Sequence, residues 1–134
     1  MRSILVAEGS VLRRAEIASV FDRCYRLIPA ASAEELLPLV EEFSPDVLLI
    51  CQEFAGKDTL LLVEKAKALV PHVIVIVVSE CGDMDFAVNA LKSGAVTVMT
   101  GVPSPDVLYS SVAGKIPPDG DIGGTDMPWK IKGC

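Results

Sequence analysis

Four short runs of apolar, mostly β-branched residues restrict the fold of this chain more than any other feature. They lie at residues 4–7, 47–50, 73–78 and 96–99. None shows the polar alternation of a half-exposed strand, and such runs are typical of strands that are covered on both faces of a parallel sheet. We expect a weaker strand at residues 26–29, because the alternation of strands and helices would otherwise lack one there.

Helical patterns fill the intervals between these runs. Residues 11–22 place Val11, Ala15, Ala18 and Phe21 on one face, which we expect to be buried. Further helices are predicted from residue 32, at 59–70, at 84–93 and from residue 104. Together the segments form five strand–helix units in succession.

Local signals mark where several of these helices begin and end. Ser32 and Glu35 have the spacing of a capping box, and Pro38 removes one backbone amide, so a kink or a shifted start is expected there. Gly94 is suited to a left-handed C-cap of the fourth helix. Ser104, followed by proline, is the expected N-cap of the fifth.

The succession of units predicts an α/β fold with a doubly wound five-stranded parallel sheet and helices on both faces. After residue 116 the chain becomes rich in Gly, Pro and Asp and loses its periodicity. We therefore expect one domain at residues 1–116 and a flexible C-terminal tail or linker at 117–134.

Composition and charge exclude several kinds of partner and site. Of the 134 residues, 51% are apolar, which is enough for a core without metals or disulfides. The net charge of −6 disfavours nucleic acid as a partner. The four cysteines form no CxxC pair and His72 is the only histidine, so we expect no zinc site. No signal peptide or membrane-spanning run is present, and we expect a cytoplasmic protein without a membrane partner.

In a parallel α/β sheet, functional residues gather where the strands end. The corresponding segments are residues 8–10, 51–53, 79–81 and 100–102. Glu8 is the only carboxylate directly at a strand end, and no Lys or Arg lies in these segments. No glycine-rich phosphate-binding motif is present. The sequence therefore predicts no cofactor and no catalytic residue.

Residues 3–116 resemble the receiver domain of bacterial response regulators. ILVAEG stands where that family has a strand and two acidic residues, SPDVLLIC where a strand ends in the phospho-accepting Asp, and VIVIVVS where a strand ends in Thr or Ser. The most specific match is GDMDFAVNALKSGAVTVMTG, which is similar to receivers that precede AAA+ or helix-turn-helix output domains. The resemblance implies a flavodoxin-like (CheY-like) sheet of order 2-1-3-4-5 and a role in two-component or phosphorelay signalling.

The chain departs from the family at most positions of the phosphorylation pocket. Glu8 keeps the first acidic position and Ser79 the Thr/Ser position, but Gly9, Cys51 and Gly101 replace the second acid, the acceptor Asp and the Lys. The resemblance therefore implies a degenerate pocket without a metal, in which Glu8 is at most a remnant ligand. Phosphoryl transfer depends on charge neutralisation by metal and lysine, so aspartyl phosphorylation is not expected.

These departures indicate a pseudo-receiver that is not an enzyme and acts as a phosphorylation-independent interaction or regulatory module. The resemblance implies binding through the fourth helix, the fifth strand and the fifth helix. The candidate contacts are Val88, Val98, Val107 and Tyr109, where Val98 stands at the aromatic position of the family. The partner would be a protein: an output domain, a kinase or a second copy in a homodimer.

Two other functions remain open at this point. The first is a thiol-based redox sensor centred on Cys51, with a disulfide to Cys81 as one form, although burial beside Glu8 would favour an inert thiol. The second is a pseudo-receiver that binds a small molecule or nucleotide over Glu8, Cys51 and Gly101. Trp129 in the tail is a candidate aromatic anchor for a partner.

Overall fold

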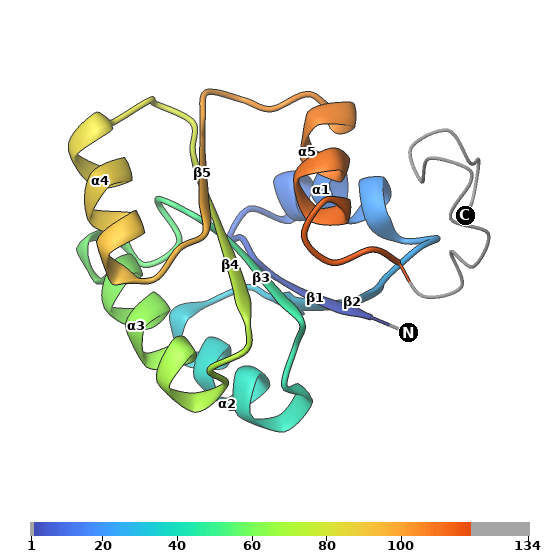
Figure 1. Cartoon of the computed structure of the whole chain (residues 1–134), viewed down its shortest axis with the longest axis horizontal. Coiled ribbons are helices and arrows are strands. Elements are labelled where there is room, and N and C mark those ends of the chain that lie inside the picture. Colours follow the sequence, from blue (N-terminus) through green and yellow to red (C-terminus); the bar gives the residue numbers. More distant parts are fainter. Residues whose placement is uncertain (1, 119–134) are drawn as a thin grey trace.

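The computed structural model describes residues 2–118 and shows a five-stranded parallel sheet with helices on both faces (Figure 1). The strands are β1 (Ser3–Ala7), β2 (Arg26–Ala30), β3 (Val47–Cys51), β4 (Ile74–Ser79) and β5 (Thr97–Thr100). Their order is β2-β1-β3-β4-β5, and every neighbouring pair is parallel. The predicted fold class and strand order are confirmed.

Five α-helices alternate with these strands and divide between the two faces (Figure 1). They are α1 (Val11–Phe21), α2 (Ala33–Phe43), α3 (Thr59–Leu69), α4 (Met84–Ser93) and α5 (Pro105–Ala113), and a short 3-10 helix, η1 (Gly56–Asp58), precedes α3. Helices α1 and α5 pack on one face, whereas α2, α3 and α4 pack on the other.

The three central strands, β1, β3 and β4, are apolar along almost their whole length because each face of the sheet carries its own core. In β3, Leu49 and Cys51 join the cluster under α1 and α5, while Leu48 and Ile50 join the cluster under α2, α3 and α4. Since alternate side chains point to opposite faces, a strand covered on both sides needs apolar residues at every position. This explains why the sequence shows continuous runs instead of alternation.

The end signals of the helices are confirmed in two cases and wrong in a third. The hydroxyl of Ser104 accepts a hydrogen bond from the amide of Val107, and Gly94 adopts a φ of 119° after α4. The Ser32 side chain, in contrast, makes no cap hydrogen bond to the backbone of α2. Its partner Glu35 accepts from the amide of Ala31 at 3.1 Å and from the Ser32 hydroxyl at 3.4 Å, so the carboxylate bonds to the residue before the N-cap and not to the N-cap amide as a capping box requires.

Helix α2 begins directly after Ser32 and continues through Pro38, so its start is not shifted. In α1 the predicted buried face is only partly right. Ile17 and Phe21 are buried and, being four residues apart, define the face of the helix that meets the sheet. Val11 precedes Ile17 by six residues, which turns it away from that face, and it is 69% exposed.

The chain just after α5 is held by an aromatic cluster and one hydrogen bond. Tyr25 packs edge-on against Phe21 and Tyr109, and its hydroxyl donates to the carbonyl of Ile116 at 2.6 Å. Of the predicted tail, only residues 117 and 118 are described, so Trp129 lies outside the described residues. No helix within residues 2–118 is long and apolar enough to cross a membrane.

Candidate functional site

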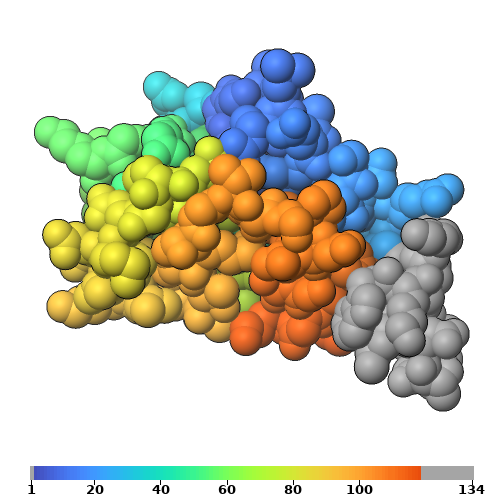
Figure 2. All heavy atoms as spheres, turned by 90° about the horizontal axis from the view of Figure 1, so that it is seen from above, coloured from blue at the N-terminus to red at the C-terminus, as the bar shows by residue number. Residues whose placement is uncertain are grey.

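The register of the sheet brings the predicted pocket positions to one edge. Cys51 pairs with Val78, and Ser79 pairs with Thr100, so the ends of β3, β4 and β5 are level. The amide of Gly101 donates to the carbonyl of Ser79 at 2.9 Å. Figure 2 looks onto the molecule from this side, where the blue α1, the yellow β4–α4 segment and the orange β5–α5 segment adjoin.

Cys51, at the acceptor position, is a buried thiol that stays protonated. Its side chain is only 4% exposed. Burial raises the pKa of Cys51 far above its usual range, and the hydrogen bond with Glu8 and the negative charges of Glu8 and Glu80 raise it further. The positive charge of Arg13 opposes this shift but is the smallest contribution. The geometry therefore disfavours a nucleophilic or redox-active Cys51.

Glu8 is held in place by local hydrogen bonds at the start of α1. Its carboxylate accepts from the amide of Ser10 at 2.9 Å, and its carbonyl accepts from the guanidinium of Arg14 at 2.7 Å. A side chain at Gly9 would meet only the carbonyl of Ala31 at 3.6 Å, an ordinary contact. Within residues 2–118, no three His, Cys, Asp or Glu side chains are grouped so that they could hold a metal ion.

Ser79 is fully buried, and its hydroxyl is used within the protein. It donates to Oε1 of Gln52 at 2.6 Å and accepts from the amide of Asp83 at 3.3 Å. The thiol of Cys81 donates to the same Gln52 oxygen at 3.3 Å, and Nε2 of Gln52 donates to Asp83 at 3.4 Å. Gln52 is thus the centre of a polar network that the sequence did not reveal.

A positively charged side chain does lie near the pocket, although the segments that follow the strands contain no Lys or Arg. Arg13 reaches from α1 and forms an ion pair with Glu80 of the β4–α4 loop. Its Nε also lies 3.3 Å from a carboxylate oxygen of Glu16. This ion pair could not be predicted from the sequence, because Arg13 and Glu80 are 67 positions apart and belong to different strand–helix units. Both of its partners are acidic, so the charge of Arg13 is already balanced.

Gly101, at the lysine position, has a left-handed backbone with a φ of +83°. A Cβ there would meet no atom within 4 Å, so the space is open. The conformation, however, is one that residues other than glycine adopt only at a cost. A side chain introduced at Gly101 would therefore have room but would strain the backbone.

The predicted contacts on α4, β5 and α5 differ in exposure. Val88 and Val107 are exposed, and Val98 is half-buried. The prediction that Tyr109 is a surface contact is wrong: it is 7% exposed and stacks on Phe21 with ring centroids 5.8 Å apart. As the fifth residue of α5, it points into the core with Leu108. Met84 and Leu91, which were not predicted as contacts, are also exposed and lie on α4 with Val88.

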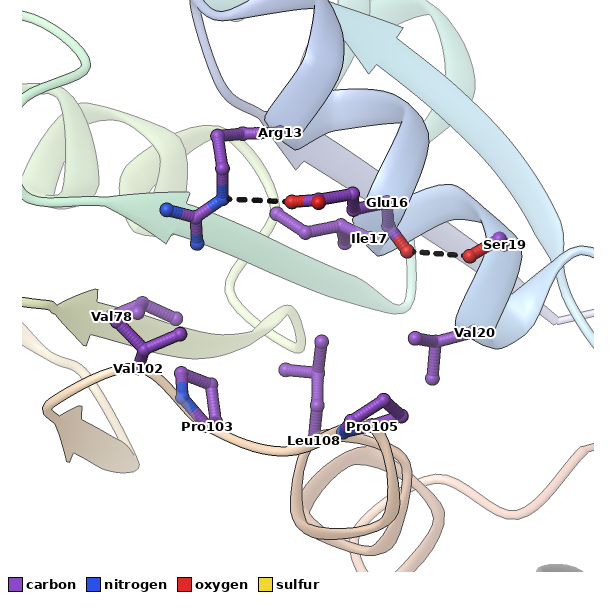
Figure 3. A pocket seen from close by; sticks show the side chains of 10 residues that line it. All are labelled: Arg13, Glu16, Ile17, Ser19, Val20, Val78, Val102, Pro103, Pro105 and Leu108. Atoms are coloured by element: carbon purple, nitrogen blue, oxygen red, sulfur yellow. Dashed lines mark hydrogen bonds and ion pairs between the residues drawn. The ribbon is translucent and has the colours of Figure 1, made fainter.

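A groove of about 500 Å³ opens between α1, the β5–α5 loop and the start of α5 (Figure 3). Its lining is mostly apolar and consists of Arg13, Glu16, Ile17, Ser19, Val20, Val78, Val102, Pro103, Pro105 and Leu108. Glu8, Cys51 and Gly101 do not line it. The groove is therefore separate from the ligand site that the sequence suggested.

No family model and no curated protein matches this sequence. Solved structures do match. A response regulator from Thermotoga maritima is 21% identical with a TM-score of 0.78, and the match covers 85% of this chain and 96% of that one. A CheY-like receiver domain protein from Methanospirillum hungatei JF-1 is 22% identical with a TM-score of 0.80 over 86% and 93% of the two chains.

A third match is to a much longer protein. NtrX from Brucella abortus, solved in complex with ADP, is 24% identical with a TM-score of 0.75, and the match covers 84% of this chain but 25% of NtrX. Each of the three matches covers 84–86% of this chain with a TM-score of 0.75 or more. The chain therefore has the fold of response-regulator receiver domains.

Proposed function

We propose that this domain is a pseudo-receiver that binds a protein partner in two-component or phosphorelay signalling without being phosphorylated. The observation that carries this proposal is Cys51: a buried, protonated thiol occupies the end of β3. A neutral thiol cannot form the acyl phosphate of a receiver. The domain is accordingly a binding module and not an enzyme.

The chemistry around Cys51 supports the same conclusion. A magnesium ion requires hard oxygen ligands, usually including carboxylates. The Glu8 carboxylate already accepts the Ser10 amide, and the hydroxyl of Ser79 is already bonded to Gln52. Arg13, the cation near the pocket, is paired with acidic side chains. Little is left to bind a metal or to neutralise a transferred phosphoryl group.

The surface of α4 supports a protein as the partner. Met84, Val88 and Leu91 are each about half exposed or more, and their spacing of four and three residues places them on one face of the helix. Exposed apolar side chains that gather on one helix face are a feature of protein interaction sites. Val107 on α5 adds to the candidate surface.

Two measurements test the proposal. Incubation with acetyl phosphate and Mg²⁺ should leave the intact mass unchanged, and a stable gain of one phosphate on residues 51–58 would overturn it. Sedimentation and affinity capture should then reveal a partner, or a second copy, whose binding is weakened by Val88→Lys. Leu61→Lys, at an exposed leucine of α3, is the matched control and should bind normally. Equal binding by both variants would rule out the α4 surface.

The redox alternative receives no support from this geometry. Cys51 and Cys81 are both free, and the raised pKa of Cys51 suppresses the thiolate that oxidation requires. Cys81 is exposed but donates its hydrogen to Gln52. We therefore do not propose a redox function.

A further inference from the structure

The groove between α1 and α5 leaves apolar side chains open to solvent (Figure 3). Its floor is formed by Ile17, Val78 and Leu108, which belong to the core cluster of that face. Its lip includes Val102, which is 71% exposed, and Pro103. The volume of about 500 Å³ is enough for one or two large side chains, and covering this surface would be favourable.

One end of the groove carries an excess of negative charge. Arg13 and Glu16 line it, and Glu80 is paired with Arg13 at the same place. Two carboxylates thus share one guanidinium. The side chain of Glu16 is 73% exposed and remains accessible to a further cation. An occupant with an apolar body and a nearby positive charge would complement both the floor and this end.

The C-terminal part of the sequence, beyond the described residues, contains a segment that combines apolar and positively charged residues. Residues 127–134 read MPWKIKGC, with Met127, Pro128 and Trp129 followed by Lys130 and Lys132 and without an acidic residue. The segment is positive in a chain whose net charge is −6. Trp129 is the only tryptophan of the chain.

The chain is long enough for this segment to reach the groove. Eight residues lie between Pro118, the last described residue, and Met127, and the nine Cα-to-Cα steps from one to the other span up to about 30 Å when extended. Helix α5 has nine residues and is about 13 Å long, and the groove lies beside its first turn. The path from the end of α5 back to its start is therefore shorter than the available chain.

We propose that residues 127–129 of the same chain dock in the groove between α1 and α5, with Lys130 beside Glu16. The indole of Trp129 covers Val102 and the apolar floor, and the lysine adds a charge contact at the acidic end. The attachment is intramolecular, so a modest affinity suffices because the effective concentration is high. The inference does not depend on the function proposed for α4.

Trp129 is itself the reporter for the experiment, since no other tryptophan contributes fluorescence. In the folded full chain we expect a blue-shifted emission and at least about twofold weaker quenching by acrylamide than in the urea-unfolded chain, because a docked indole is shielded from solvent. Both values should be independent of protein concentration. If the blue shift appears only at high protein concentration, Trp129 docks into a second copy of the chain, and the intramolecular proposal is wrong.

Variants of the groove distinguish docking there from shielding elsewhere. Val102→Lys and Ser19→Lys place a cation on its lining at exposed positions, and we expect both to restore quenching to the level of the unfolded chain. Leu61→Lys, at an exposed leucine of α3 on the other side of the sheet, is the matched control and should leave Trp129 protected. Circular dichroism verifies that each variant is folded.

Two further outcomes would overturn the proposal. The first is an equally quenched Trp129 in the folded and unfolded parent chain, which would leave the groove to an external ligand. The second is a protected Trp129 that neither Val102→Lys nor Ser19→Lys exposes, which would place the indole at another surface.

Discussion

Replacing Cys51 by Asp restores the acceptor carboxylate of a receiver, and the structure predicts that the domain will be destabilised. The side chain at this position is 4% exposed and lies against the Glu8 carboxylate. Arg13, the nearby cation, is already paired with Glu80. The new carboxylate would therefore be buried beside a like charge without a free partner, and its pKa in the folded state should rise.

The loss of stability can be calculated from the rise in the pKa of the introduced carboxyl. If the pKa of the introduced carboxyl moves from about 3.9 in the unfolded chain to about 6 in the folded one, the free energy of unfolding at pH 7 falls by about 3 kcal/mol. A raised folded-state pKa means that stability is present below about pH 4 and is lost as the pH rises toward the folded-state value. At about pH 5 the loss should therefore be only about half as large.

Urea unfolding followed by circular dichroism measures both quantities, and Cys51→Asn is the matched control. Asn has the size of Asp but no charge, so the difference between the two variants isolates the ionisation at residue 51. We expect that difference to be about 3 kcal/mol at pH 7 and to shrink on acidification. Two variants of equal stability at both pH values would show that residue 51 is solvated or has a cationic partner, and the description of the pocket would be wrong.

Three further predictions concern the same edge of the sheet. Iodoacetamide at neutral pH should modify exposed Cys81 before buried Cys51, as peptide mass mapping would reveal, and the reverse order would revive the thiol-sensor hypothesis. Because the pKa of Cys51 is raised on folding, stability should fall by about 1.4 kcal/mol per pH unit above about pH 8.5, and Cys51→Ala should show a shallower decline in urea unfolding. Gly101→Lys should cost about 1–2 kcal/mol because φ is +83°, and Gly101→Asn should cost less; equal stabilities would contradict the backbone argument.

The sheet could be predicted from the sequence because its signal is local and repeated. Runs such as residues 47–50 and 73–78 are apolar at every position, and only strands covered on both faces require this. The strand bounds differ by a residue or two, since β4 begins at Ile74 and ends at Ser79. The carboxyl ends of the strands, and with them the positions of Cys51 and Ser79, followed from the same pattern.

The polar contacts of the site could not be predicted, because they join side chains from different units. Gln52 appeared only as a neighbour of Cys51, yet it bonds to Ser79 and Asp83 across the gap between β3 and β4. Arg13 lies outside the strand-end segments, and only the fold brings it to Glu80. Periodicity gives the direction of a side chain relative to its own element, whereas these contacts depend on how the loops meet.

The burial of Tyr109 likewise could not be predicted from the sequence. The resemblance to receivers assigned it to a binding face, but α5 turns it toward Phe21 and Tyr25, where three rings pack together. An aromatic residue with a hydroxyl suits a surface and an interior equally well, and its burial depends on the neighbours that tertiary packing supplies.

The hydrogen bonds at the start of α4 bear on how that helix would bind. The amide of Asp83 donates to the hydroxyl of Ser79, and its carboxylate accepts from Gln52 and caps the amide of Phe86. The first turn of α4 is thus attached to the ends of β3 and β4. Met84 and Val88 are consequently presented on a backbone that is ordered before any encounter. A partner that binds there pays little of the conformational entropy that a mobile helix would demand, and its association should be fast and need no preceding rearrangement.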